Sequence, residues 1–556
     1  MAKRTSSPPE AASPSPQPEQ PPISSRAQLI DALRLAVELE HNLMCQYLFA
    51  AYSVKKLPSE DISPVELERA RRWESLITLI ARQEMEHLGL ALNLLTAIGG
   101  TPSFSRPNFP QPSDYYGQTH IHSTLTRCNL ATLQRFQRFE APDALAYPDQ
   151  AAPPVLSRPR ETSAARHPAH ELLDLELHER RAQHPRPTAD RLSPGTEPLP
   201  PIDPRKALHW CQEETRQPVE AIARMLEQGA QRRQSQARGP VPKGLVGLAP
   251  QPVVVKSVQE LYEDIHAGFV HLSGELGECN LFIGKKTWQI FGGPTSPQYG
   301  SMSDLNQYGL DVIGVTDLKS ATRVIRMILE QGEGIQAPPA YLPHTHFCMF
   351  TRVVEEMKAH GLEERASRPV VANPMTRYRP DVSLRDEVNL ITHPDTLPVA
   401  QVFNDCYEVM LTLLLYLYSD AVKTQAQTNA LMDAAFFPLM TMFVRPLAEL
   451  LTEMPAFADG RPGNAGPGFE LSGDVLNLPT FDGTWTLFQE RLDSLSGQLQ
   501  AIVARGDRWL GLKGQKVPDP HESRIFKRLK YVRDNMQRLA LDWRQDWLNI
   551  GRTGNV

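Results

Sequence analysis

Closely spaced cysteines are absent from this chain. Its 556 residues include six cysteines that form no CxxC pair, namely Cys45, Cys128, Cys211, Cys279, Cys348 and Cys406. This spacing gives no support for a zinc knuckle or for the dense disulfide framework of small secreted proteins. We therefore predict free, mostly buried thiols in a protein of a reducing compartment.

An excess of basic residues is also missing. Lys and Arg number 58 against 64 Asp and Glu, which gives a net charge of −6. Because proteins that bind nucleic acid usually carry a basic surface, we expect no nucleic-acid partner. The most apolar stretch, VMLTLLLYLY at 409–418, is too short to span a bilayer, and the N-terminus has no signal-peptide core. We predict a cytoplasmic protein with no membrane partner.

Proline, by contrast, is abundant and divides the chain. The 49 prolines concentrate in loops, in a Pro/Ser-rich tail at 1–24 and in an insertion at 143–249 with weak periodicity. Such composition cannot build a core of its own, so we expect the tail to be disordered and the insertion to be partly disordered and peripheral. The parts of the chain that we expect to be folded are 25–142, 250–365 and 366–556.

Capping boxes and apolar stripes predict helices through all three of these ranges. Strand signals are few and short, at 252–256 and 281–291. We therefore predict an all-α protein in which 25–142 and 250–365 form the two halves of one bundle and 366–556 is an additional helical region. The expected helices are 26–56, 63–99, 130–142, 258–275, 318–332, 343–361, 396–424, 427–453, 484–505 and 522–548, with a further one inside the insertion at 205–232.

Three E-x-x-H motifs occur, and helical periodicity separates them. They are Glu38/His41, Glu84/His87 and Glu263/His266. At about 100° per residue, Glu40 lies at the centre of the apolar stripe of the first long helix, whereas Glu38 and His41 fall off that stripe. Glu84 lies in the stripe of the second helix with His87 at its edge, and Glu86 points away. We expect Glu38, His41 and Glu86 to face solvent.

An ionised carboxylate in a core costs several kcal/mol unless it is compensated. A divalent metal ion bound by Glu40, Glu84 and His87 would supply that compensation. The alternative is that both glutamates pair with buried Arg or Lys side chains or lie at a hydrated seam between helices.

A second half-site would complete a two-metal centre, which takes roughly one Glu from each of two helices and a Glu-x-x-His from each of the others. Glu330 falls on the polar face of its helix. Glu333 lies between two glycines, Gly332 and Gly334, where that helix is expected to end. His346 centres an apolar stripe, where a hydrogen-bonded core histidine is the alternative. The candidates are therefore Glu263 with His266, Glu330, Glu333 and His346.

Several stretches together resemble the ferritin-like domain of iminophenyl-pyruvate dimer synthase type proteins. That family includes enzymes that couple two amino-acid-derived imines on the way to violacein and rebeccamycin-like bis-indoles. The resemblance covers about 26–142 and 250–475, and implies a ferritin-like four-helix bundle. The stretches that carry it are AVELEHNLMCQYLFAAYSVKK, ARQEMEHLGLALNLLTAIGGTP, LQRFQRFEAP, SVQELYEDIHAGF, VTDLKSATRVIRMILEQGEG and HTHFCMF.

The resemblance places the family's acidic and histidine positions on residues of this chain. Its "EH" glutamate corresponds to Glu40, its E-x-x-H to Glu84 and His87, its "EQGEG" to 330–334 and its "HF" to His346 and the next residue. Two departures stand out, because Gln83 replaces a second acidic residue and NLMCQY replaces a Pro-rich turn. From the spacing and the resemblance we predict as metal ligands Glu40, Glu84, His87, Glu333, His346 and Glu263.

Three functions are compatible with these residues. The first is a non-haem iron enzyme, with two iron ions, that uses dioxygen or peroxide to oxidise a small amino-acid-derived substrate, as in imine coupling. The second is a ferroxidase or storage-like protein that handles iron without an organic substrate. The third is a metal-free scaffold that keeps only the fold. The sequence leaves a homo-oligomer open.

Overall fold

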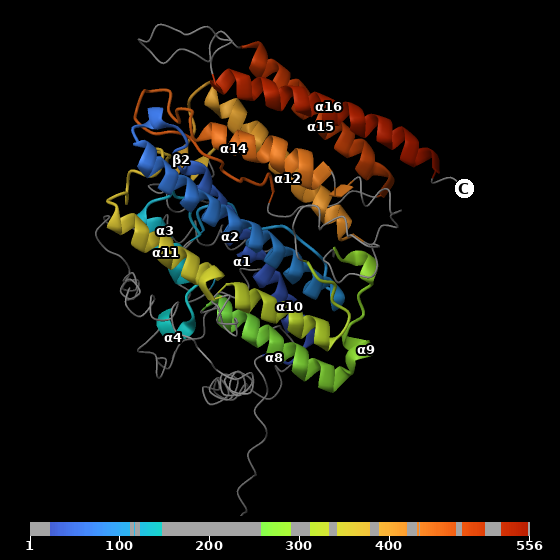
Figure 1. Ribbon diagram of the computed structural model, residues 1–556. Coiled ribbons are helices and arrows are strands. Elements are labelled where there is room, and N and C mark those ends of the chain that lie inside the picture. Colours follow the sequence, from blue (N-terminus) through green and yellow to red (C-terminus); the bar gives the residue numbers. More distant parts are fainter. Residues whose placement is uncertain are drawn as a thin grey trace, which may run out of the picture.

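The computed structural model describes residues 23–111, 116, 123–146, 257–290, 312–332, 342–377, 388–419, 431–473 apart from 433, 481–505 and 524–553. Within these ranges the chain is mainly helical, which confirms the predicted fold class (Figure 1). Two-residue strands β1 (Pro374–Met375) and β2 (Asn389–Leu390) pair in parallel. The strand expected at 281–291 is wrong, because this part holds the short helices α9 (Glu278–Leu281) and η3 (Lys286–Trp288). The other expected strand and most of the insertion lie outside the described residues.

Two long helices form the centre of the molecule. Helix α1 (Arg26–Ser53) begins where the Ser25 side chain accepts a hydrogen bond from the backbone N–H of Gln28. Helix α2 (Pro64–Ala97) begins with the predicted capping box, in which Ser63 and Glu66 satisfy each other's backbone N–H groups. It ends before Gly99, whose φ of 82° suits the left-handed turn that stops a helix.

Four helices close into a bundle. Helix α1 packs on α2 and on α8 (Val258–Leu276), and α10 (Leu318–Gln331) packs on both α8 and α2. Ser257 and Asp317 cap the N-termini of α8 and α10, as the sequence predicts. These are the four helices expected to form the bundle core.

Two shorter helices continue the bundle beyond α8 and α10. Helix α3 (Leu130–Phe139) packs on α11 (His346–Ala359), which also contacts α2. The backbone N–H of Phe347 donates to the carbonyl of Gly332 at 3.2 Å, so the end of α10 meets the start of α11. Helices α10 and α11 therefore lie end to end beside α2 (Figure 1). The bundle thus has a break in one helical rod, next to two unbroken helices.

A C-terminal layer covers the opposite side of α1 and α2. It contains α12 (Thr396–Leu417), the π-helix η7 (Ala435–Val444) and α14 (Arg445–Leu451). Helices α15 (Phe481–Ala504) and α16 (Arg524–Thr553) pair with each other outside this layer (Figure 1). Helices α1 and α2 therefore lie in the middle of the molecule.

This layering corrects two predictions of exposure. His41 is 0% exposed and Glu86 is 4% exposed, so neither faces solvent. His41 hydrogen-bonds to Tyr407 of α12, and Glu86 lies 3.9 Å from Arg82. Periodicity marks the more apolar face of a helix, but a helix between two packed layers has no fully solvated face at these positions.

The thiol prediction holds in part. Cys45, Cys128, Cys279 and Cys406 are free, whereas Cys348 is disulfide-bonded. The prediction was wrong for Cys348, because the spacing of cysteines along the sequence does not report which thiols meet in the fold.

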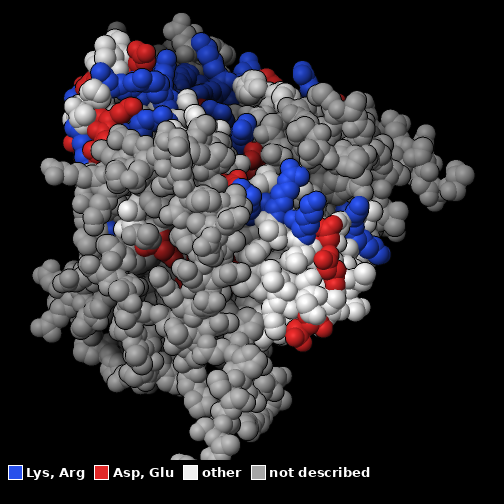
Figure 2. Space-filling model, turned by 60° about the horizontal axis from the view of Figure 1, so that its bottom comes forward, with Lys and Arg blue, Asp and Glu red and all other residues white. Residues whose placement is uncertain are grey.

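The described surface carries charges of both signs. On the face in Figure 2, Lys and Arg side chains gather along the upper edge with Asp and Glu side chains beside them. Among the described helices, none combines the length and apolar character needed to cross a membrane.

Candidate metal site

Five ionisable side chains converge at the break in the bundle. Glu40 comes from α1, Glu84 and His87 from α2, Glu140 from the residue after α3, and His346 from the first residue of α11. Their exposed fractions lie between 0% and 4%. At this break, the end of α3 and the start of α11 bring Glu140 and His346 into the bundle interior.

Glu84 lies between the two histidines. Its Oε1 is 2.8 Å from His346 Nδ1, and its Oε2 is 3.5 Å from His87 Nδ1. The imidazole rings stack with centroids 5.3 Å apart. Ligand atoms of these three residues all lie within 4.8 Å of one another, a spacing that could hold a metal ion. Glu84 and His87 can share an ion because residues three apart lie on one side of a helix.

Two further carboxylates flank this group. Glu40 Oε2 lies 3.8 Å from His87 Nδ1, and Glu140 Oε2 lies 3.4 Å from His346 Nδ1. Acids and imidazoles therefore alternate in a row, with Glu84 at its centre. We call this set the alternating row, and it consists of Glu40, His87, Glu84, His346 and Glu140.

Each histidine is oriented by a glutamine. His87 Nε2 lies 2.8 Å from Gln331 Oε1, and His346 Nε2 lies 3.2 Å from Gln83 Oε1. An amide oxygen only accepts hydrogen bonds, so in both rings Nε2 is the donor. Nδ1 of each ring therefore faces the carboxylates, which is the arrangement in which a second partner fixes the tautomer of a metal-binding histidine.

The outer carboxylates are also held. The Tyr262 hydroxyl donates to Glu40 Oε1 at 2.5 Å, and the Tyr47 hydroxyl donates to Glu140 Oε1. Gly332 leaves room for Glu140, because a Cβ there would lie 3.3 Å from Glu140 Oε2. Each outer carboxylate thus keeps its second oxygen, Oε2, toward the histidines.

Without a metal, the two histidines and Glu40 of the row hold protons more tightly than they would in water. Burial opposes charge on Glu84, but the positive charges of His346 and His87 outweigh it and hold the pKa of Glu84 well below its usual value. Burial lowers the pKa of both histidines, yet the adjacent carboxylates raise that of His346 to about 9 and that of His87 well above its usual value. Burial and then the charge of Glu84 raise the pKa of Glu40 to about 8. Metal binding must displace these protons.

The donor set fits a divalent ion such as iron. Within the described part of the chain, Glu84 Oε2 and His346 Nδ1 are fully buried, and their charged neighbours in the row do not meet them in hydrogen-bond geometry. Such orphaned atoms are costly unless something else coordinates them. Carboxylate oxygen and imidazole nitrogen together suit iron in bundle cores.

One predicted ligand, Glu333, lies outside the described residues. Another, Glu263, does not join the row. Glu263 is on α8, but its Oε1 accepts from Gln259 of the same helix, and the preceding residue, Tyr262, reaches Glu40 instead. His266 lies 3.2 Å from Thr322 of α10. Glu330 pairs with Arg326 on the polar face, as the periodicity predicts.

Sequence reasoning missed Glu140. It follows directly on a short amphipathic helix and precedes Ala141 and Pro142. An acidic residue at a helix C-terminus meets the negative end of the helix dipole, so it needs compensation from elsewhere. That unfavourable position at the end of a short helix is the signal that could have identified it.

Comparisons with known proteins identify the family to which the chain belongs. Dichlorochromopyrrolate synthase of Lentzea aerocolonigenes is 24% identical over 489 residues, which cover 83% of this chain but only 37% of that protein. A solved ferritin-like protein from Caulobacter vibrioides shares 15% identity over 75% of this chain and 97% of its own, with a TM-score of 0.33. The ferritin-like family model matches residues 33–178 and 217–355, which together make up half of the sequence. The chain belongs to the ferritin-like family.

Proposed function

We propose that this protein is a non-haem iron enzyme, with two iron ions, that oxidises a small amino-acid-derived substrate in specialised metabolism. The observation that carries the proposal is the alternating row, in which three buried carboxylates and two buried histidines turn free donor atoms toward one another. The relative from Lentzea aerocolonigenes, itself a synthase, supports an enzyme over a storage protein.

The row divides into two halves that share one residue. Glu40 and His87 would hold one ion, Glu140 and His346 the other, and Glu84 lies next to both histidines. Bound iron would supply redox chemistry with dioxygen or peroxide as oxidant. The ligand set excludes Glu263 and includes Glu140. Glu333 stays a candidate.

The chain's own residues prepare this site in three ways. Gln331 and Gln83 fix both imidazoles with Nδ1 toward the carboxylates. The hydroxyls of Tyr262 and Tyr47 hold one oxygen of each outer carboxylate. The low exposure of all five side chains keeps bulk water away, which strengthens the electrostatic interactions inside the site.

Oxidative coupling of amino-acid-derived imines is the reaction we propose for the site. It follows from the family resemblance and from the name of the relative, whose full length is far greater than the matched part.

Metal analysis of anaerobically purified protein, together with oxygen uptake, tests the function. We expect about two iron ions per chain and oxygen consumption that depends on an added imine or its amino-acid precursor. Iron with oxygen consumption that needs only Fe²⁺ would indicate a ferroxidase instead. Protein that binds no iron after anaerobic reconstitution would be the metal-free scaffold, in which the histidines alone neutralise the carboxylates.

A further inference from the structure

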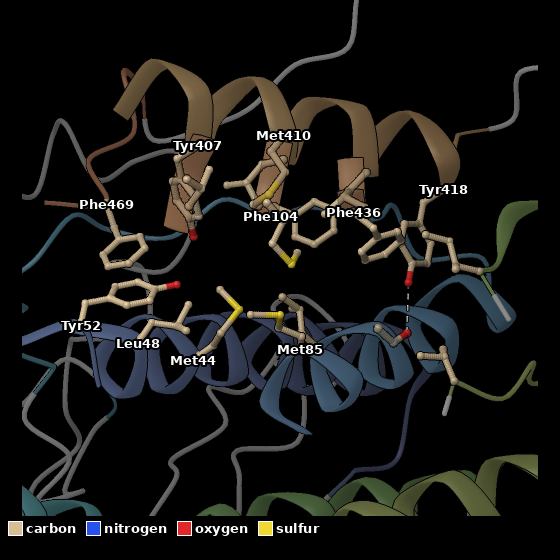
Figure 3. A pocket seen from close by; sticks show the side chains of 18 residues that line it. Met44, Leu48, Tyr52, Met85, Phe104, Tyr407, Met410, Tyr418, Phe436 and Phe469 are labelled. Atoms are coloured by element: carbon tan, nitrogen blue, oxygen red, sulfur yellow. Dashed lines mark hydrogen bonds between the residues drawn. The ribbon is translucent and has the colours of Figure 1, made fainter. Parts of the chain in front are cut away.

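A cavity of about 80 Å³ lies between α1, α2 and the C-terminal layer. Figure 3 shows it between these two helices and α12, with Met44, Met85 and Met410 extending into it. Helix η7 closes part of the wall through Phe436 and Met440. The lining is thus distinct from the five residues of the alternating row.

The lining is apolar and adaptable. None of the 18 lining residues is acidic, basic or histidine, so a charged ligand would lose its hydration without compensation. Four of these residues are methionines, whose flexible thioethers pack against aromatic rings and adjust to their shape. The four are Met44, Met85, Met410 and Met440. The wall formed by η7 is a π-helix, a form that occurs frequently at functional sites.

One tyrosine hydroxyl is available to a ligand. The cavity has three tyrosines, and two of their hydroxyls are occupied: Tyr407 contacts His41 and Cys45, and Tyr418 donates to the carbonyl of Gly89 at 3.2 Å. Tyr52 is 5% exposed, and its hydroxyl makes no hydrogen bond with any described residue. Figure 3 shows this hydroxyl directed into the cavity. A ligand atom in the cavity could therefore accept a hydrogen bond from this hydroxyl or donate one to it.

We propose that this cavity is a second binding site, for a neutral single-ring aromatic molecule with one hydroxyl or carbonyl group. The ring would lie among the methionines and aromatic side chains, and its polar atom would pair with Tyr52. A dry cavity of roughly 150 Å³ binds benzene, so this cavity of about 80 Å³ takes one ring only when the flexible methionine side chains move aside. The site is independent of the proposed iron chemistry.

Ligand-observed NMR titrations of the full-length, metal-free protein test the proposal with phenol, toluene and benzoate. We expect phenol and toluene to bind and benzoate to bind at least about tenfold more weakly, because its charge has no partner. Tyr52→Phe removes only the hydroxyl, so the affinity for phenol should fall about five- to tenfold, while the affinity for toluene stays within about twofold of that of the unchanged protein. Tyr418→Phe is the matched control, since its hydroxyl is already used, and phenol affinity should stay within about twofold.

A filling variant makes the test independent of Tyr52. Met440→Phe places a larger side chain in the cavity from the half-buried wall formed by η7. The affinities for phenol and toluene should therefore fall together. The melting temperature should stay close to that of the unchanged protein. The proposal fails if neither phenol nor toluene binds, if benzoate binds as well as phenol, or if Tyr52→Phe weakens toluene as much as phenol. Because no iron is present, none of these outcomes depends on the proposed function.

Discussion

His346 Nδ1 lies 2.8 Å from Glu84 Oε1, and this contact joins the first residue of α11 to the middle of α2. The two residues belong to opposite halves of the bundle, so their interaction ties the halves together at the level of the candidate metal site. The imidazole and the carboxylate can share a proton or bind one metal ion together. Which of the two they hold sets the strength of the interaction between the halves.

The metal-free protein should lose stability as pH rises. A histidine with a raised pKa contributes stability that is complete below its unfolded value and is lost through its folded value, which for His346 means from 6.5 to about 9. Glu40 acts in the same direction, because an acid whose pKa rises from 4.5 to about 8 destabilises the fold as it ionises. Metal affinity should rise over the same range, since binding displaces these protons. Melting temperatures at pH 6 and 9, with and without Fe²⁺, measure both effects, and parallel curves would contradict the assignment.

Glu84→Ala should abolish iron binding. Glu84 is the central acid of the row, and both histidines lose their nearest carboxylate without it. At about pH 9.5, where His346 releases its proton, we expect the free energy of unfolding to fall by less than about 3 kcal/mol. Iron content by mass spectrometry and urea denaturation give the two numbers, with Glu330→Ala as the control on the polar face. Retained iron with a loss of about 3–5 kcal/mol would make Glu84 a structural ion-pair residue.

Glu140 and Glu263 should behave oppositely. Glu140→Gln replaces the carboxylate nearest to His346 on its outer side, so iron content should fall by about half if each half of the row holds one ion. Glu263→Gln changes a residue that pairs within its own helix and should leave iron content unchanged. Iron analysis of both variants decides the ligand set, and the reverse result would restore Glu263 as the ligand.

The glutamines should matter although they do not reach the metal position. Gln83→Leu and Gln331→Leu each remove the acceptor that fixes one imidazole, so iron affinity should fall by about 10- to 100-fold. Competition with a chelator measures the change. Gln137→Leu removes a buried glutamine amide that donates to Thr351 and contacts neither histidine, so it serves as the control. An equal loss in that variant would mean that packing, not the hydrogen bond to the imidazole, explains the effect.

Arg368 should anchor the C-terminal layer to the bundle. It is 2% exposed, pairs with Glu60 before α2, and lies 3.4 Å from Glu453 after α14. Removing the cation leaves Glu60 without its cationic partner, while Glu453 keeps Arg524 and Arg528. Arg368→Ala should therefore lower the free energy of unfolding by about 3 kcal/mol. Arg445→Ala removes a half-exposed partner of Glu449 and should cost less than about 1 kcal/mol. Similar losses in the two variants would refute this role.

Much of the fold could be predicted because its signals are local. The caps at Ser63 and Asp317 and the apolar stripes placed the helices of the bundle, and periodicity put Glu40 and Glu84 inside it. The other features depend on which distant surfaces meet. His41 is buried because α12 covers α1, which no pattern within α1 can reveal.

The second half of the site illustrates the same limit. Glu263 and Tyr262 are neighbours in sequence, and a rotation of about 100° along α8 decides which of them faces Glu40. Glu140 follows its helix instead of lying in a stripe, so periodicity could not select it. Its role emerges only when α11 brings His346 beside it.

The split of the row between the two halves of the bundle has a consequence for the newly made chain. The N-terminal half of the bundle is synthesised first. It carries all three acids of the row, Glu40, Glu84 and Glu140, but only one of the two histidines. Until the ribosome has released His346, that half holds an excess of negative charge that it cannot bury at low cost. Closure of the interior must therefore wait for a segment more than 200 residues downstream of Glu140, which makes this a slow, long-range step of folding.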